Sequence, residues 1–312
     1  MTAPGATGAQ RARLLGTVFV VLGAMLFATK GILAKDLYAR GIGFEPLVAI
    51  RALVAVPFFW AFAAVRARQA PPAPARPQAI AAACLAGLIC YYGGALLDFY
   101  ALTMIDASVE RVLMFSYPAF VVVFSALLTK RRPATRVLVA CAMTYAGIYF
   151  AVGGFDHSVA RANALGATLV ILSALTFAVY FMIGERFLGE LGSARFTLYA
   201  MGSAAVALGL HYVARHPLSD LARIDAASWW VLLALGTMVM FVPALLQAEG
   251  VKRIGAERAA IVSTAGPPTT IALAWFFLDE RMTAWQFAGV ALILGGIVVL
   301  DLARGKRRAR SP

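Results

Sequence analysis

The sequence predicts an all-α membrane protein with ten transmembrane helices, arranged as two inverted five-helix repeats. Three observations lead to this prediction: the composition, the apolar segments and a self-similarity at a fixed offset. Of the 312 residues, 62% are hydrophobic and only 14% are charged, with a mean hydropathy of +0.80. A soluble domain carries about a quarter charged residues. Lipid must therefore be the solvent for much of this chain.

The apolar segments are long enough to cross a bilayer, whose core of about 30 Å requires roughly 20 helical residues. Arg11 and Arg13 precede the first segment, as in a signal peptide, but its length and its later counterpart favour a retained helix. The ten predicted spans are residues 14–34, 44–65, 78–102, 107–128, 136–152, 163–187, 194–213, 228–249, 256–277 and 282–303.

The basic residues indicate the orientation. With ten spans and a cytoplasmic N-terminus, 19 of the 28 Lys and Arg residues fall inside and 7 outside, while Lys30 and Arg51 lie within spans. This asymmetry follows the positive-inside rule. It predicts a multi-pass protein of the bacterial inner membrane with both termini cytoplasmic. Because the net charge of +13 is spread over span ends, it indicates contact with lipid headgroups and no nucleic-acid partner.

The chain is similar to itself at an offset of about 150 residues. Residues 16–37 align with 166–187 at an offset of 150, and residues 105–147 align with 254–296 at an offset of 149. The second alignment matches Pro118 with Pro267, and Lys130-Arg131-Arg132 with Asp279-Glu280-Arg281. Since each half holds five spans, the second half begins on the opposite side of the membrane.

Four segments follow from this alignment. They are a cytoplasmic N-terminal segment at residues 1–13, the first repeat at 14–154, the second, inverted repeat at 155–303 and a basic cytoplasmic tail at 304–312. Inverted repeats are a recurrent design of secondary transporters, with a site near the midplane where the repeats meet. Fold analogy alone is a weak guide to function.

Two motifs add a family resemblance. Residues 100–118, and the run from Asp279 through Gly289 into Gly295-Gly296, resemble the EamA family of ten-helix exporters in the drug/metabolite transporter superfamily. In the first half, Lys130-Arg131-Arg132 stands where the family often has an acidic-Arg pair. The resemblance implies export of amino acids, drugs or other metabolites. The aromatic middle helices look most like the YddG-type aromatic amino-acid exporters.

Ionisable residues within spans are costly and are therefore candidates for function. Lys30, Arg51 and Asp98 lie at similar depth, roughly 6–11 Å inside the outer helix ends at 1.5 Å per residue. Such a group would bind an amino acid's carboxylate and ammonium, or would close an external gate. The alternative is a structural ion pair or snorkelling side chains.

The repeat offset adds a second polar set. Asp98 corresponds to Gln247 and Tyr100 to Glu249, which under inversion lie at the cytoplasmic end of span eight. The alternative for Glu249 is simple pairing with Lys252 or Arg253.

Aromatic residues near mid-span form a third set. Tyr91 and Asp98 are seven residues apart and should share a helix face, as should Phe177 and Tyr180. A pocket lined by aromatic rings with a few polar groups suits a flat, apolar ligand. The alternative is that each ring faces lipid or packs in the core. The set is Tyr91, Tyr92, Phe115, Tyr117, Phe177 and Tyr180.

Span nine offers a small, polar face and two prolines. Ser263, Gly266, Pro267 and Thr270 follow helical spacing, so this face either packs closely against another helix or lines a cavity. Pro267-Pro268, and Pro118 in the counterpart span, should bend their helices. We expect spans four and nine to act as paired hinges.

The sequence thus predicts a secondary transporter that exports small amphipathic metabolites by alternating access, with amino acids, including aromatic ones, as the expected substrates. The predicted partners are a small-molecule substrate and the lipid bilayer, with monomer and homodimer both open and no cofactor or metal. The residues expected to bind substrate are Lys30, Tyr91, Tyr92, Asp98, Phe115, Tyr117, Phe177, Tyr180, Gln247 and Ser263. Those expected to act in gating or coupling are Arg51, Tyr100, Glu249, Pro118, Pro267 and Pro268.

Three other functions remain open. Drug or toxic-metabolite efflux belongs to the same superfamily. A passive channel or an intramembrane lipid-processing enzyme belongs to other classes. The chain lacks G-x-x-x-x-G-K-[ST], H-E-x-x-H and G-x-S-x-G motifs, which argues against an ATPase and against an enzyme.

Overall fold

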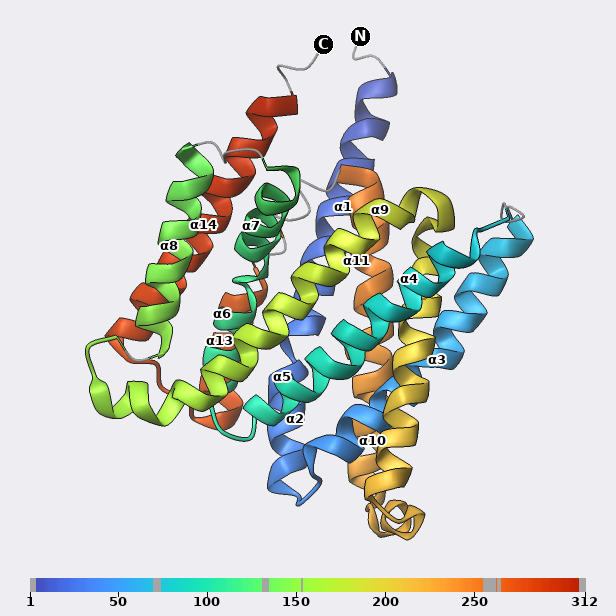
Figure 1. Ribbon diagram of the computed structural model, residues 1–312, viewed down its shortest axis with the longest axis vertical. Coiled ribbons are helices and arrows are strands. Elements are labelled where there is room, and N and C mark those ends of the chain that lie inside the picture. Colours follow the sequence, from blue (N-terminus) through green and yellow to red (C-terminus); the bar gives the residue numbers. More distant parts are fainter. Residues whose placement is uncertain are drawn as a thin grey trace.

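The computed structural model describes residues 4–69, 74–130, 135–152, 154–254, 262 and 265–308, and these contain helices and no strand. The helices form one bundle, with the start of α1 and the end of α14 at the same end of it (Figure 1). The first repeat contains α1 (Pro4–Ala28), α2 (Lys30–Ala39), α3 (Phe44–Gln69), α4 (Pro77–Gly87), the π-helix η1 (Leu88–Gly94), α5 (Ala95–Ala101), α6 (Ala107–Met114), α7 (Tyr117–Thr129) and α8 (Thr135–Val152). The second contains α9 (His157–Arg215), the 3-10 helix η2 (Leu218–Arg223), α10 (Ala226–Gly236), the π-helix η3 (Thr237–Phe241), α11 (Val242–Ile254), α13 (Gly266–Leu278) and α14 (Ala284–Arg308).

Within the described residues, six helical segments are long and apolar enough to cross a membrane. They are Arg13–Ala39, Phe44–Arg68, Pro77–Ala101, Ser158–Gly184, Ala194–Arg215 and Ala226–Gln247. Leu138–Val152 and Ala284–Gly296 are shorter apolar helices. The chain is therefore a multi-pass helical membrane protein, and the count of ten spans stays a prediction.

The outer surface of the bundle is apolar where lipid would lie. Trp275, Phe276 and Phe277 on α13 and Leu210 on α9 expose between 62% and 74% of their surface. A contiguous set of large exposed apolar side chains would aggregate in water. These residues are compatible with a bilayer around the bundle.

The prolines of spans four and nine lie at helix starts, so the expectation that they bend a continuous helix is wrong. Span four is divided into α6 and α7 by a turn at Phe115 and Ser116, and Pro118 lies in the first turn of α7. Pro267 and Pro268 likewise occupy the first turn of α13. Proline is tolerated there because the N–H groups of a first turn have no intrahelical acceptor. Pro118 thus begins the second helix of span four, and Pro267 and Pro268 begin α13 in span nine.

The local geometry repeats at the offset of 149 residues. η1 begins at Leu88 and η3 at Thr237, and α7 and α13 begin at Tyr117 and Gly266. The two non-glycine residues with positive φ among the described residues, Lys130 at 51° and Asp279 at 52°, end these last two helices. π-helices and left-handed non-glycine residues are both rare. Their paired occurrence supports the internal repeat.

Contacts between helices repeat at the same offset. A Cβ added to Gly87 on α4 would lie 2.0 Å from the carbonyl oxygen of Ala200 on α9. A Cβ added to Gly236 on α10 would lie 2.8 Å from the carbonyl oxygen of Arg51 on α3. Gly236 is equivalent to Gly87, and Ala200 is equivalent to Arg51, at the offset of 149. The two repeats therefore use the same backbone-to-backbone packing.

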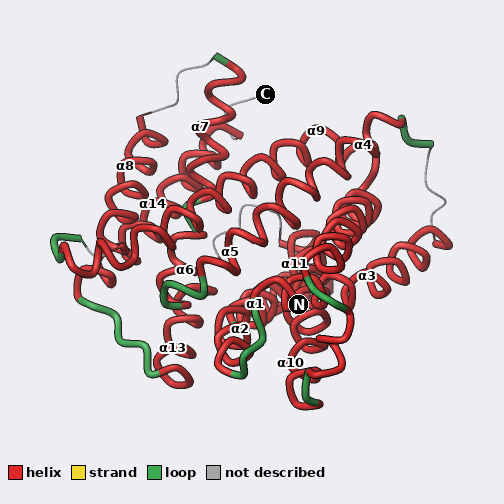
Figure 2. Tube along the Cα trace, turned by 60° about the horizontal axis from the view of Figure 1, so that its bottom comes forward, coloured by secondary structure: helices red, strands yellow, loops and turns green. Residues whose placement is uncertain are grey.

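α8 and α14 pack together at the side of the bundle (Figures 1 and 2). Cβ atoms added to Gly147 and Gly289 would meet the facing backbone at 2.9 Å and 2.5 Å, respectively. Small residues allow such approach between membrane helices. The last helix of each repeat is thus fixed against its counterpart in the other repeat.

α9 contains two spans joined at Gly192, whose φ of 71° and ψ of 159° are non-helical. This backbone region is accessible almost only to glycine. We expect Gly192→Ala to destabilise the fold by about 1–3 kcal/mol, although a Cβ there would have open space around it. Thermal unfolding in detergent, with Gly189→Ala as the control in equally open space, would measure this cost. Equal stability of the two variants would contradict it.

Candidate functional site

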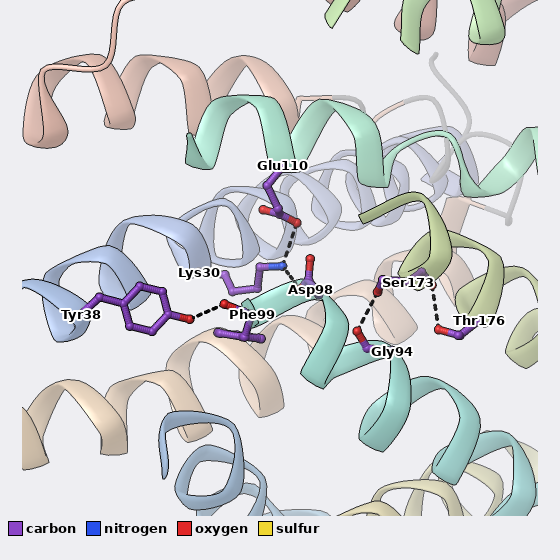
Figure 3. Close-up of polar contacts among 8 residues, drawn as sticks. All are labelled: Lys30, Tyr38, Gly94, Asp98, Phe99, Glu110, Ser173 and Thr176. Carbon is purple, nitrogen blue, oxygen red and sulfur yellow. Dashed lines mark hydrogen bonds and ion pairs between the residues drawn. The ribbon is translucent and has the colours of Figure 1, made fainter. Parts of the chain in front are cut away.

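A buried ion-pair cluster lies between three helices of the first repeat (Figure 3). The Lys30 Nζ donates to Asp98 Oδ2 at 2.5 Å and to Glu110 Oε1 at 3.0 Å. All three side chains expose 6% or less of their surface. Charges are buried in proteins only when they are paired. Lys30 and Asp98, predicted to lie at similar depth, thus form an ion pair, and their role in binding substrate stays a prediction.

Helix breaks bring these side chains together. Lys30 is the first residue of α2, after a break at Thr29, while Asp98 lies on α5 and Glu110 on α6. The neighbouring backbone is also cross-linked, because Tyr38 Oη donates to the Phe99 carbonyl and Ser173 Oγ donates to the Gly94 carbonyl, each at 2.8 Å (Figure 3).

Two further buried cations, Arg51 and Arg111, border the cluster. Arg51 lies over the Phe99 ring at 4.2 Å, and Arg111 lies over the Phe115 ring at 5.0 Å, in cation–π geometry. The Nε atoms of both arginines are buried and have no hydrogen-bond partner among the described residues. Asp98 Oδ1 is likewise buried without a partner. Unpaired buried polar atoms are uncommon and call for an explanation.

By formal charge, the five side chains comprise three cations and two anions. Lys30, Arg51 and Arg111 face only two carboxylates, those of Asp98 and Glu110. A ligand carboxylate would satisfy the Nε–H groups of Arg51 and Arg111, and a ligand ammonium would satisfy Asp98 Oδ1. The chemistry of the cluster matches a zwitterion.

The sequence analysis missed Glu110 and assigned Arg111 to the external side of span four. Both lie on α6 and are buried, exposing 1% and 7%. The available signal was two adjacent opposite charges inside the predicted span 107–128. The sequence analysis counted Arg111 among the external cations and did not consider Glu110.

Aromatic rings form a second cluster between α9, η1 and α7. The Tyr91 ring lies 5.1 Å from Tyr180 and 6.2 Å from Phe177, and Tyr117 lies 6.3 Å from Phe177. Phe181, which the sequence analysis did not select, stacks on Tyr117 at 5.2 Å. Four of the six predicted aromatic residues are therefore neighbours. Phe115 instead contacts Arg111.

The prediction that Tyr91 and Asp98 share one helix face is wrong, because the two side chains contact different helices. Tyr91 contacts α9, whereas Asp98 contacts α2. The reason is the π-helix η1, because its wider turns rotate the helix face between the two residues. Tyr92 lies elsewhere again, with its hydroxyl 3.0 Å from His211 Nδ1.

His211 belongs to a polar network that the sequence analysis did not find. Glu45 at the start of α3 pairs with His211, His216 and Arg215 near the end of α9. The network connects the start of α3 with the end of α9. Nothing in the sequence spacing relates Glu45 to residues more than 160 positions away.

The predicted cytoplasmic set is dispersed. Glu249 pairs with Arg66 at 3.0 Å and with Arg253 at 3.3 Å, as the alternative interpretation expected in part. Gln247 Nε2 donates to the Val20 carbonyl at 3.3 Å. Tyr100 is 41% exposed and contacts Phe44.

The small face of span nine packs closely against other helices. Gly266 faces Arg111, and Thr270 Oγ1 donates to the Ala28 carbonyl at 3.2 Å. Ser263 lies outside the described residues. Among the described residues, no group of three His, Cys, Asp or Glu side chains could hold a metal ion.

Comparisons with known proteins agree with this architecture. The EamA-like transporter family matches residues 14–153 and again residues 164–301. The uncharacterized transporter YcbK of Bacillus subtilis is 31% identical over 300 residues, covering 94% of this chain and 95% of that protein. The uncharacterized inner membrane transporter YicL of Salmonella typhimurium is 24% identical over 206 residues, covering 66% of this chain and 67% of that protein.

A solved crystal structure shows a similar fold. It superposes with a TM-score of 0.64 at 19% identity, covering 95% of this chain and 99% of the other. The double match of one family to the two repeats accounts for most of the sequence. This chain is a membrane transporter that belongs to the EamA-like transporter family.

Proposed function

We propose that the protein is a secondary transporter that exports small amphipathic metabolites across the inner membrane by alternating access, with amino acids, including aromatic ones, as substrates. The observation that carries this proposal is the buried cluster of three cations and two carboxylates, together with a separate cluster of aromatic rings. Charged groups of both signs suit an amino acid's carboxylate and ammonium. The rings suit a flat apolar side chain.

The repeat supports a two-part site. At the offset of 150, Lys30 of the charge cluster corresponds to Tyr180 of the aromatic cluster. On the polar side, Arg51 lies over the ring of Phe99, the residue next to Asp98, at 4.2 Å. Equivalent places in the two repeats thus hold groups of complementary chemistry, one polar and one aromatic.

Counterflow in proteoliposomes tests the function. Vesicles loaded with unlabelled phenylalanine should take up labelled phenylalanine with saturable kinetics, and other amino acids should compete according to side-chain size. If no amino acid competes with any other, the amino-acid proposal is wrong. Flux that does not saturate would indicate a pore.

Tyr180→Ala should weaken transport of aromatic amino acids more than of aliphatic ones. Losing ring contacts of about 0.5–1.5 kcal/mol would raise the KM for phenylalanine by about 2- to 10-fold, with little change for alanine. Phe276→Ala is the matched control, since its ring is 74% exposed on the outer face of α13. An equal KM increase for both substrates would show that Tyr180 supports the fold and does not select the side chain.

A further inference from the structure

Glu280, in the second repeat, accepts three hydrogen bonds from the first turn of α6 in the first repeat. Its Oε1 accepts from the Ala107 backbone N–H at 2.9 Å. Its Oε2 accepts from the Ser108 backbone N–H at 3.1 Å and from Ser108 Oγ at 2.8 Å. One side chain therefore joins two segments 172 residues apart.

The arrangement is favourable because helix N–H groups in the first turn have no acceptor within the helix. A carboxylate satisfies them with charge-assisted bonds and complements the positive end of the helix dipole. Glu280 follows α13 directly, so these bonds hold the end of α13 against the start of α6.

The same short helix carries the charge cluster. Glu110 and Arg111 lie within one turn of Ser108 on α6. Gly266, the first residue of α13, also faces the Arg111 guanidinium. A displacement of α6 relative to α13 would therefore move the groups that bind Lys30 and the proposed substrate.

The neighbouring boundary between α2 and α13 is loosely packed. A groove of about 510 Å³ lies between them, lined by Lys35 and Asp36 from α2, by Thr29 just before it, and by Leu273 and Phe277 from α13. Both helices end at the side of the bundle opposite the chain termini (Figure 1). Movement of α13 would widen a space that already exists.

The residue equivalent to Glu280 in the first repeat has different hydrogen-bonding chemistry. At the offset of 149, Glu280 corresponds to Arg131, which lies outside the described residues. A guanidinium group only donates hydrogen bonds and cannot accept them from helix N–H groups. At this position the sequence provides a hydrogen-bond acceptor in the second repeat and a donor in the first.

We propose that Glu280 is the latch residue of the external gate. Its carboxylate holds α6 against α13 when the gate is closed, and release of its three hydrogen bonds opens the outer end of the boundary between the repeats. This inference rests on the alternating-access function proposed above, and it assigns the gate to a residue outside the charge cluster.

The test is the accessibility of a cysteine behind the latch. Ile32 lines the groove and is 8% exposed, so Ile32→Cys in a chain with Cys84, Cys90 and Cys141 changed to alanine reports opening. In cells, we expect Glu280→Gln to raise its labelling by an external membrane-impermeant maleimide about tenfold or more, the factor for losing one charge-assisted hydrogen bond.

Asp279→Asn is the matched control, because it removes the same charge from the adjacent residue, which is 84% exposed. Its labelling should equal that of the unchanged chain. If Glu280→Gln fails to fold, Ser108→Ala removes only the 2.8 Å bond and should give a smaller increase. Labelling of both variants at the Asp279→Asn rate, or labelling only from the cytoplasmic side, would overturn the proposal. Because the assay requires no substrate, its result is independent of the amino-acid proposal.

Discussion

Lys30→Met should abolish transport and destabilise the protein by about 3–5 kcal/mol, the cost of leaving buried charges without their partner. The ammonium is the direct partner of both Asp98 and Glu110, at 2.5 Å and 3.0 Å. Without it, two carboxylates remain in a site that exposes almost no surface to solvent. Thermal unfolding in detergent and counterflow in liposomes would measure the two effects.

The control for this change is Lys35→Met on the same helix. Lys35 lines the groove beside α13 and forms no ion pair with a described residue, so its loss should change stability little. Lys30→Arg, which keeps the charge, should retain more stability than Lys30→Met. A Lys30→Met protein with the melting temperature of the unchanged chain would refute the ion-pair account.

Gly87→Ala should prevent α4 from packing against α9. The added Cβ would lie 2.0 Å from the carbonyl oxygen of Ala200 and 2.5 Å from its Cα, and backbone atoms cannot move aside as a side chain can. Overpacking costs about 1–3 kcal/mol, and more where backbone must shift. We expect a severe loss of monodisperse protein in size-exclusion chromatography.

Gly202→Ala on α9 provides the comparison, because nothing lies within 4 Å of its added Cβ. Alanine there should be neutral or stabilising by about 0.5–1 kcal/mol, since glycine is unfavourable within a helix. Gly236→Ala, at the position equivalent to Gly87, should resemble Gly87→Ala. Similar yields for Gly87→Ala and Gly202→Ala would show that the helices separate without cost.

The repeat could be predicted from the sequence because it leaves matched residues at a constant offset. The alignment of Pro118 with Pro267 anticipated the equivalent starts of α7 and α13. The position of Lys30 and Asp98 at similar depth anticipated their ion pair. Both predictions depend only on counting residues along regular helices.

The features that the sequence analysis did not predict depend on departures from regular helices or on contacts between distant residues. The π-helix η1 carries no composition signal, and it turned Tyr91 and Asp98 toward different neighbours. The turn after α6 left Glu110 and Arg111 on a short buried helix. The partners of Glu280 and Glu45 are distant in sequence, and spacing cannot reveal them.

The paired π-helices have a consequence for the history of the chain. A π-helix holds additional residues relative to an α-helix of the same length, and its retention requires a compensating benefit. Two such features at positions 149 residues apart are more simply explained by one insertion in an ancestor of half the length. On this account the irregular turn is older than the gene duplication, and both copies inherited it before their charges diverged.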